Sequence, residues 1–186
     1  MTLADKVTSI RLVLAPVFFI IYIFTEAFWT VPVLWLLFLG SEITDLLDGI
    51  IARKRNEVTD FGKLFDPFAD TLTQLTYFLC FVVDGILSPI LFLLVIYREF
   101  SILLIRNLML KKGLTIGARM GGKIKTVTYI AAAGLALLAS SILRLGLSSE
   151  IYRILTIAAT VVFIISVVIA VLSLFDYLSV YRKADK

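Results

Sequence analysis

The sequence of 186 residues contains no histidine and a single cysteine, and only 17% of its residues are charged. Without histidine, Ser-His-Asp triads and histidine proton shuttles are impossible, so any general base must be a carboxylate, lysine, tyrosine or water. A metal ion must then bind oxygen ligands, which favours Mg²⁺ or Mn²⁺ over Zn²⁺. The single cysteine, Cys80, cannot form an intrachain disulfide, and its place in an apolar run predicts a buried packing role.

Apolar residues are abundant: 60% of the chain is hydrophobic and the mean hydropathy is +1.01, against about 45–50% apolar residues in a soluble domain. They form six runs of about the length that crosses a bilayer. We therefore expect an all-α polytopic membrane protein with six transmembrane helices, a short N-terminal interfacial segment at residues 1–8, and a first helix that is retained rather than cleaved. Residues 1–186 are expected to form one membrane domain. The runs cover approximately residues 9–25, 30–52, 63–83, 86–109, 122–143 and 151–179.

Basic residues gather at both ends of the chain and in alternate connections between the runs. The positive-inside rule then places both termini, and the links after the second and fourth runs, on the cytoplasmic side. This pattern predicts a multi-pass protein of the inner (cytoplasmic) cell membrane, surrounded by membrane lipids. Nucleic-acid binding is disfavoured because the charges flank membrane segments. The basic residues in question are Lys6, Arg11, Arg53, Lys54, Arg55, Lys63, Lys111, Lys112, Arg119, Lys123, Lys125, Arg182, Lys183 and Lys186.

Four aspartates stand out from these apolar surroundings. Asp45 and Asp48 are spaced i, i+3 near the end of the second run, and Asp66 and Asp70 are spaced i, i+4 near the start of the third. Each pair therefore projects from one helix face. Because the link between the two runs is short, we expect antiparallel neighbours whose four carboxylates converge on a cavity at the cytoplasmic surface. A charged side chain at a membrane helix centre costs about 2.5–3.5 kcal/mol on insertion scales, so this cluster predicts a functional site.

Charge balance indicates what the cluster binds. Clustered carboxylates repel one another and either protonate or bind cations, and two divalent cations would balance the four aspartates. Two cations about 3.5–4 Å apart are typical of phosphoryl-type displacement. Gly49 and Ala52 either admit a ligand or allow close helix packing, and the Arg53 guanidinium suits phosphate. Taken singly, each aspartate could instead pair with a neighbouring basic residue or end a helix in water.

The spacing D-x2-D-G-x2-A-R-x8-G-x3-D-x3-D, from Asp45 to Asp70, resembles the signature of the CDP-alcohol phosphotransferase family at every fixed position. The resemblance implies a six-helix membrane enzyme, usually a homodimer, with two divalent cations, Mg²⁺ or Mn²⁺, as cofactors. It implies that Asp70 is the catalytic base as well as a metal ligand. The implied metal ligands are Asp45, Asp48, Asp66 and Asp70, and the implied CDP-binding residues are Asp45, Gly49, Ala52, Arg53 and Gly62.

Residues 7–16, 97–100, 106 and 121–126 resemble the family members that transfer a phosphatidyl group from CDP-diacylglycerol to glycerol 3-phosphate. Glycerol 3-phosphate is an anion whose capture requires cations besides those at the aspartates. Positive-inside charge or binding to anionic lipid headgroups is the alternative role for the basic residues. Arg98 and Glu99 either pair with each other or with a neighbour, or they orient part of the site. The residues expected to bind the acceptor phosphate are Arg106, Arg119, Lys123 and Lys125.

Two positions depart from the family pattern. Thr71 stands where lysine usually follows the last aspartate, which would remove a surface charge, and Glu42 stands where a small apolar residue is expected. Both leave other acceptors open, namely serine, inositol phosphate or choline. Two other classes of protein remain as alternatives: a divalent-cation transporter that uses membrane carboxylates, and a non-catalytic membrane scaffold.

Overall fold

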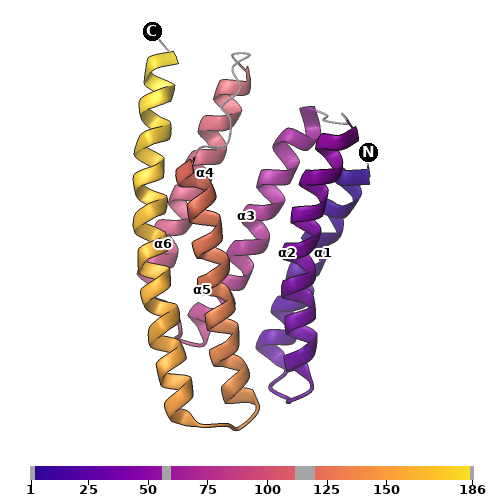
Figure 1. Cartoon of the computed structure of the whole chain (residues 1–186), viewed down its shortest axis with the longest axis vertical. Helices are drawn as coiled ribbons and strands as arrows, with labels where there is room; N and C mark the ends of the chain where they lie inside the picture. The colour runs from indigo at the N-terminus through magenta and orange to yellow at the C-terminus, as the bar shows by residue number, and fades with distance from the viewer. Residues whose placement is uncertain (1–2, 56–59, 112–119, 185–186) are drawn as a thin grey trace. The chain divides into compact units, whose positions relative to one another are not determined.

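The computed structural model describes the backbone of residues 3–55, 60–111 and 120–184, and the side chains of residues 8–44, 62, 64–111 and 121–182. Six α-helices and no strand occupy these ranges, which confirms the predicted all-helical fold (Figure 1). Each helix overlaps one of the six predicted apolar runs. The helices are α1 (Leu3–Phe24), α2 (Thr30–Arg55), α3 (Asp60–Val83), α4 (Pro89–Lys111), α5 (Met120–Arg144) and α6 (Ser149–Ala184).

Length and composition identify two of the described helical stretches as able to cross a membrane, Gly121–Arg144 and Ser149–Arg182. Thr8–Phe24 and Thr30–Thr44 are shorter apolar helices among the residues considered. The apolar helices indicate a membrane protein. That all six helices span the bilayer stays a prediction.

The expected interfacial segment at residues 1–8 is not a separate element, because α1 begins at Leu3 and continues without a break through Thr8. No proline or glycine interrupts this stretch, so it extends the first helix at little cost once that helix has formed. The start of α3 is likewise earlier than expected. The helix begins at Asp60, and Gly62 is a buried residue of its first turn rather than its first residue.

The chain divides into two compact units, Met1–Cys80 and Phe81–Lys186, with α3 crossing the boundary. Aromatic side chains hold the first unit together. The Tyr77 ring of α3 lies 4.7 Å from the Phe18 ring of α1 and 5.4 Å from the Phe38 ring of α2, between ring centroids, in edge-to-face geometry. Such pairs stabilise packing beyond the area that they bury. Cys80 is buried and forms no disulfide, which confirms its predicted packing role.

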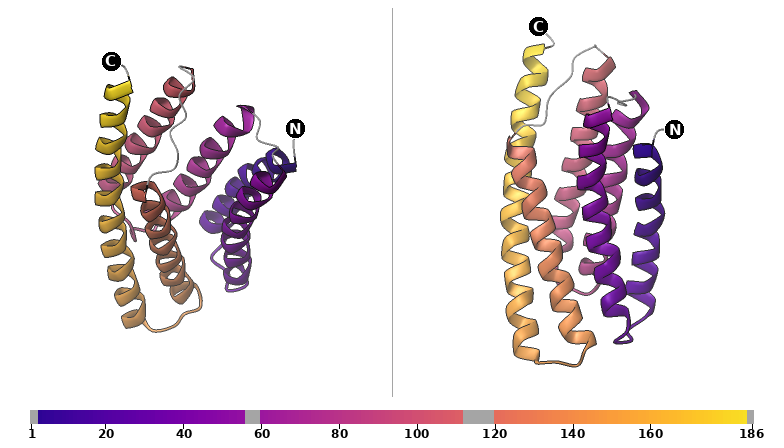
Figure 2. Two further views of the ribbon diagram at one scale, coloured as in Figure 1. Left: turned by 45° about the horizontal axis from the view of Figure 1, so that its top comes forward. Right: turned by 45° about the vertical axis from the view of Figure 1, so that its right-hand side comes forward.

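In the second unit, α6 packs against both α4 and α5 (Figure 2). Small side chains line the buried side of α5, among them Ala132, Ala136 and Ala139. At the start of α5, a Cβ added to Gly121 would lie 3.4 Å from Cβ of Ser173 in α6. Small residues allow this close approach of neighbouring helices. The start of α5 is therefore held tightly against the second half of α6.

Glycine ends α3 and α5 in the same way. Gly85 and Gly146 have φ values of 72° and 64°, in the left-handed region that L side chains rarely adopt. The amide of the next residue, Ile86 or Leu147, donates to a carbonyl five residues earlier, at 2.9 or 3.1 Å. These are Schellman motifs, which satisfy the last carbonyls of a helix and turn the chain sharply.

Candidate active site

The backbone of the first unit places the four aspartates at similar distances along α2 and α3 from the connection between these helices. Asp45 and Asp48 lie in the second half of α2, and Asp66 and Asp70 lie in the first half of α3. Residues 56–59 join the two helices, so these helix segments lie at the same end of the unit. With a rise of about 1.5 Å per residue, all four positions fall about 9–15 Å along their helices from that connection. The side chains of Asp45 and Asp48 lie outside the described residues, so convergence of the four carboxylates stays a prediction.

The carboxylate of Asp66 is held by α1. The Thr8 hydroxyl donates a hydrogen bond to Oδ1 of Asp66 at 2.8 Å, and the Thr8 side chain is fully buried. A buried hydroxyl fixed in this way limits the rotation of the carboxylate that it contacts. Thr8 therefore sets the orientation of Asp66.

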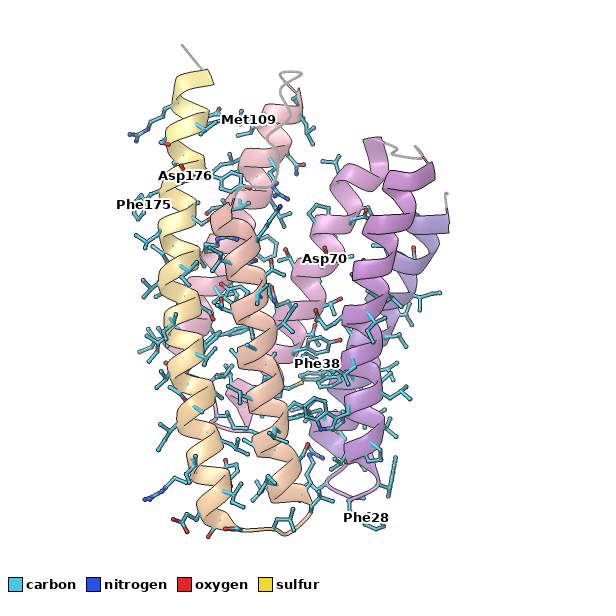
Figure 3. All side chains as sticks on the ribbon, in the orientation of Figure 1. Phe28, Phe38, Asp70, Met109, Phe175 and Asp176 are labelled. Atoms are coloured by element: carbon cyan, nitrogen blue, oxygen red, sulfur yellow. The ribbon has the colours of Figure 1, made fainter. Side chains whose placement is uncertain are left out.

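Asp70, labelled on α3 in Figure 3, also contacts α1. Nη1 of Arg11 lies 2.8 Å from Oδ1 of Asp70, and the two side chains are 5% and 43% exposed. The cation is thus buried, whereas much of the acid stays accessible. The sequence indicates for Arg11 only a contribution to the positive charge near the N-terminus. In the structure, Arg11 forms an ion pair with Asp70.

The other predicted residues of the aspartate region differ in burial, and some lie outside the described side chains. Gly62 is buried in the first turn of α3, and Glu42 is half-buried in α2. Thr71 is buried, so the expectation that it replaces a surface charge is wrong: it lies on the inward face of α3. The side chains of the predicted CDP-binding residues Ala52 and Arg53, like the surroundings of Gly49, lie outside the described residues.

The donor chemistry of the described residues fits a hard divalent cation. Asp66 and Asp70 offer only carboxylate oxygens, which suit Mg²⁺ or Mn²⁺. Within the ranges whose side chains are described, no group of three or more Cys, Asp or Glu side chains lies together. Because Asp45 and Asp48 fall outside those ranges, the predicted four-aspartate set is untested.

A second ionic cluster occupies the second unit. Nη1 of Arg98 donates to both carboxylate oxygens of Glu99 at 2.9 Å, and Nζ of Lys125 donates to Oε1 of Glu99 at 3.0 Å. Arg98 also donates to the Ala170 carbonyl and to Ser173 Oγ of α6. The three charged side chains are at most 10% exposed. Arg98 and Glu99 therefore pair with each other, and Glu99 also pairs with the neighbouring Lys125.

The predicted acceptor-binding residues differ in their surroundings. Lys123 is exposed, whereas Lys125 is buried against Glu99 and its Nζ lies 4.7 Å from the centroid of the Tyr129 ring. Two residues apart on a helix lie on different faces, which explains the contrast. Arg106 donates from Nη2 to Tyr177 Oη at 3.2 Å, and among the described residues nothing accepts a hydrogen bond from its buried Nε. Arg119 lies outside the described residues.

Sequence reasoning assigned no role to Thr8 and none beyond topology to Arg11. The available signal was Arg11 itself. Arg11 is the third residue of the apolar run 9–25, and an arginine in such a run has to find a partner, because an unpaired charge in a membrane segment is costly. The partner could not be identified, because the sequence does not specify which helices are in contact.

Comparison with known proteins identifies the class. Residues 1–172 match the family model described as CDP-alcohol phosphatidyltransferase. The chain belongs to this family of membrane transferases, as the aspartate signature predicted.

The relatives give a more particular likeness. The chain is 35% identical, over 97% of its length and 89% of the relative, to "CDP-diacylglycerol--glycerol-3-phosphate 3-phosphatidyltransferase" of Treponema pallidum (strain Nichols). It is 34% identical to the protein of the same name from Bacillus subtilis (strain 168), over 73% of this chain and 76% of that protein. It is also 30% identical to "Probable phosphatidylglycerophosphate synthase" of Mycobacterium tuberculosis (strain ATCC 25618 / H37Rv), over 95% of this chain and 80% of that protein.

Proposed function

We propose that this protein transfers a phosphatidyl group from CDP-diacylglycerol to glycerol 3-phosphate, giving phosphatidylglycerol phosphate and CMP. One structural observation supports the chemistry most directly: Asp66 and Asp70 of the family signature lie on one face of α3, and each is held by a side chain of α1. The likeness to relatives named for this reaction, which covers 97% of this chain for one and 73% for the other, supports the choice of substrates.

The proposed cofactors are two divalent cations, Mg²⁺ or Mn²⁺, with Asp45, Asp48, Asp66 and Asp70 as their ligands. When bound, such cations neutralise a pyrophosphate and stabilise charge on the departing phosphate. Thr8 keeps Asp66 in one orientation for this role. The oxygen-only chemistry of Asp66 and Asp70 supports the assignment of a hard cation.

Asp70 is the proposed general base. Its carboxylate is partly exposed, so an acceptor hydroxyl has access to it. Asp70 takes the proton of the primary hydroxyl of glycerol 3-phosphate as the hydroxyl oxygen attacks the phosphorus that carries the diacylglycerol. A new P–O bond to glycerol forms as the bond between that phosphorus and the bridging oxygen breaks, and CMP departs. We propose direct displacement without a covalent intermediate on the protein.

Two further sets of residues bind the substrates in this proposal. Asp45, Gly49, Ala52, Arg53 and Gly62 bind the CDP group. The small residues admit it and the Arg53 guanidinium pairs with phosphate. The phosphate of glycerol 3-phosphate is bound by cations of the second unit and of the link before α5. This second set comprises Arg106, Arg119, Lys123 and Lys125.

We further propose that residues 1–186 form one membrane domain and that the protein works as a homodimer in the inner membrane, in contact with lipid. All six helices would span the bilayer, with the active site and both termini on the cytoplasmic side, as the distribution of basic residues favours. Single cysteines introduced near each terminus of a Cys80→Ser variant test the orientation. A membrane-impermeant thiol reagent should label them only in inverted vesicles, and labelling in intact cells would contradict the proposal.

The reaction is tested with purified protein, CDP-diacylglycerol and Mg²⁺, with each alcohol offered separately. We expect CMP release with glycerol 3-phosphate, and not with serine, inositol phosphate or choline. Release only with another alcohol would overturn the acceptor assignment. Metal uptake into sealed vesicles without CMP release would instead indicate a transporter.

A further inference from the structure

Two side chains of α1 contact two aspartates of α3 in matching register. Thr8 contacts Asp66, and Arg11, one turn later in α1, contacts Asp70, one turn later in α3. α1 and α3 begin at the same end of the first unit and run parallel (Figure 1). The two contacts therefore join the helices at successive turns. A single surface ion pair is common and often carries no function. Two aligned polar contacts from buried side chains to the same pair of acids are a more specific arrangement.

The burial of the two α1 side chains shows that these contacts are fixed. Thr8 is fully buried, and Arg11 is 5% exposed. A buried arginine without an acid is costly, so the Arg11 guanidinium and the Asp70 carboxylate stabilise each other. Because Asp70 is 43% exposed, its carboxylate remains accessible to a further ligand while Arg11 stays in place.

The two contacts have opposite consequences for a divalent cation. The Thr8 hydroxyl is neutral and orients Asp66, and partners of this kind typically raise metal affinity about 10–100-fold. Arg11 carries a positive charge next to a carboxylate that would bind the cation, so it repels the cation and occupies Oδ1, one of the two oxygen atoms that the carboxylate could offer. Arg11 also balances part of the negative charge of the aspartates when no cation is bound.

We propose that α1 supplies two positioning residues to the aspartate region: Thr8, which orients Asp66 for metal binding, and Arg11, which holds Asp70 and weakens metal binding by competing for its carboxylate. The inference rests on the proposed function in taking Asp66 and Asp70 as metal ligands. It adds that α1 adjusts the affinity of the site in both directions. A site with such a competitor releases its cation more readily than four aspartates alone would.

The test measures Mn²⁺ binding to the purified full-length protein without substrate, from the electron paramagnetic resonance signal of free Mn²⁺. Arg11→Gln should bind Mn²⁺ roughly tenfold more tightly than the unaltered protein, because a neighbouring positive charge is gone. Arg11→Met, which keeps an unbranched apolar stem at the buried position, is the second neutral variant and should also bind more tightly. Arg11→Lys should return the affinity toward that of the unaltered protein.

Thr8→Val keeps the shape of the side chain but removes the hydroxyl, and should weaken Mn²⁺ binding roughly tenfold. Thr8→Ser keeps the hydroxyl and should restore the affinity. A merely structural role for Arg11 predicts equal or weaker Mn²⁺ binding in both neutral variants, and that result would overturn its part of the inference. Unchanged affinity in Thr8→Val would overturn the part played by Thr8.

The outcome for the unaltered protein separates this inference from the proposed function. If the unaltered protein binds no Mn²⁺, the metal-dependent mechanism fails, and this inference fails with it. If it binds Mn²⁺ and the variants do not differ in the predicted directions, only the inference about α1 fails. Tighter binding in the neutral Arg11 variants with weaker binding in Thr8→Val supports both.

Discussion

The ion pairs of the two units differ in how far their acidic side chains are exposed to solvent. Among the described side chains of the first unit, the buried cation Arg11 pairs with Asp70, which is itself 43% exposed. Among those of the second unit, the buried acid Glu99 pairs with two cations, Arg98 and Lys125, and none of the three is more than 10% exposed. The acid of the first cluster is partly accessible to ligands, whereas all three side chains of the second cluster are buried.

The contrast shows that a charge in an apolar helix is not by itself a binding group. Asp70 is partly accessible and so can contact a substrate, whereas the Lys125 ammonium is engaged by Glu99 and lies over the Tyr129 ring. Buried ion pairs contribute little net stability, but removing one partner is costly. The second cluster is therefore expected to matter most for stability, and the first for turnover.

The largest expected effect concerns turnover in the first unit. Asp70→Asn keeps one oxygen ligand, so it should fold, bind CDP and bind metal more weakly, but should lose about 10²–10⁴ of its rate, because a proposed general base is removed. The measurement is CMP release at saturating substrate. Asp176→Asn, the same chemical change at an exposed position of α6, is the matched control and should retain the rate. Near-normal turnover in Asp70→Asn would rule out Asp70 as the base.

The next effect concerns stability in the second unit. Glu99→Gln leaves the buried Arg98 and Lys125 without their carboxylate, and should lower the free energy of unfolding by about 3–5 kcal/mol. The unfolding midpoint in detergent measures the loss, and Glu150→Gln at the exposed start of α6 is the control. Adding Lys125→Met should restore part of the stability, because it removes one unpaired cation. No change in Glu99→Gln would show that the cluster is not a structural unit.

A smaller effect concerns the exposed lysine beside this cluster. Lys123→Ala should raise the KM for glycerol 3-phosphate roughly tenfold and that for CDP-diacylglycerol much less, because one charge-assisted hydrogen bond to the acceptor phosphate is lost. Lys111→Ala, at the exposed end of α4, serves as the control. Equal changes in both KM values would instead indicate a structural role for Lys123, although its side chain is exposed.

The smallest expected effect is the change in stability on replacing a glycine, which involves no charge and serves as a reference for Glu99→Gln. Gly146→Ala places a side chain at φ 64° and should cost about 1–2 kcal/mol of stability, although there is space for the added methyl group. Gly40→Ala, inside α2 with nothing within 4 Å of the new Cβ, should be neutral or stabilising by up to about 1 kcal/mol. A loss of stability in Glu99→Gln no larger than that of Gly146→Ala would weaken the claim that buried charge is decisive.

Much of the fold follows from the sequence, because apolar runs of bilayer length are a strong signal. All six predicted runs became helices, and Cys80 is buried as expected. The errors arose where a local pattern was interpreted without its neighbours. Thr71 was expected at the surface but packs inward. The sequence also did not reveal that Lys123 is exposed and Lys125 is buried, and their shared role in binding the acceptor phosphate stays a prediction.

The candidate site was predictable only in part, for the same reason. The spacing of the aspartates along the chain is visible in the sequence and matches the family signature. The contacts of Thr8 and Arg11 with Asp66 and Asp70 depend on which face of α1 meets α3, and that is a property of tertiary packing. A single sequence records that Arg11 needs a partner but not which acid it is.

Because α6 is long, the thickness of the bilayer affects which of its residues lie among the lipid headgroups. At about 1.5 Å per residue, the helix Ser149–Ala184 is about 54 Å long, well beyond a hydrocarbon core of about 30 Å. As a membrane span it must tilt or project past the lipid tails. Residues 154–175 carry no charge, and Asp176 and Tyr177 follow directly. Tyr177, which holds Arg106, then lies at headgroup level, where a thicker or thinner bilayer changes the medium around that contact.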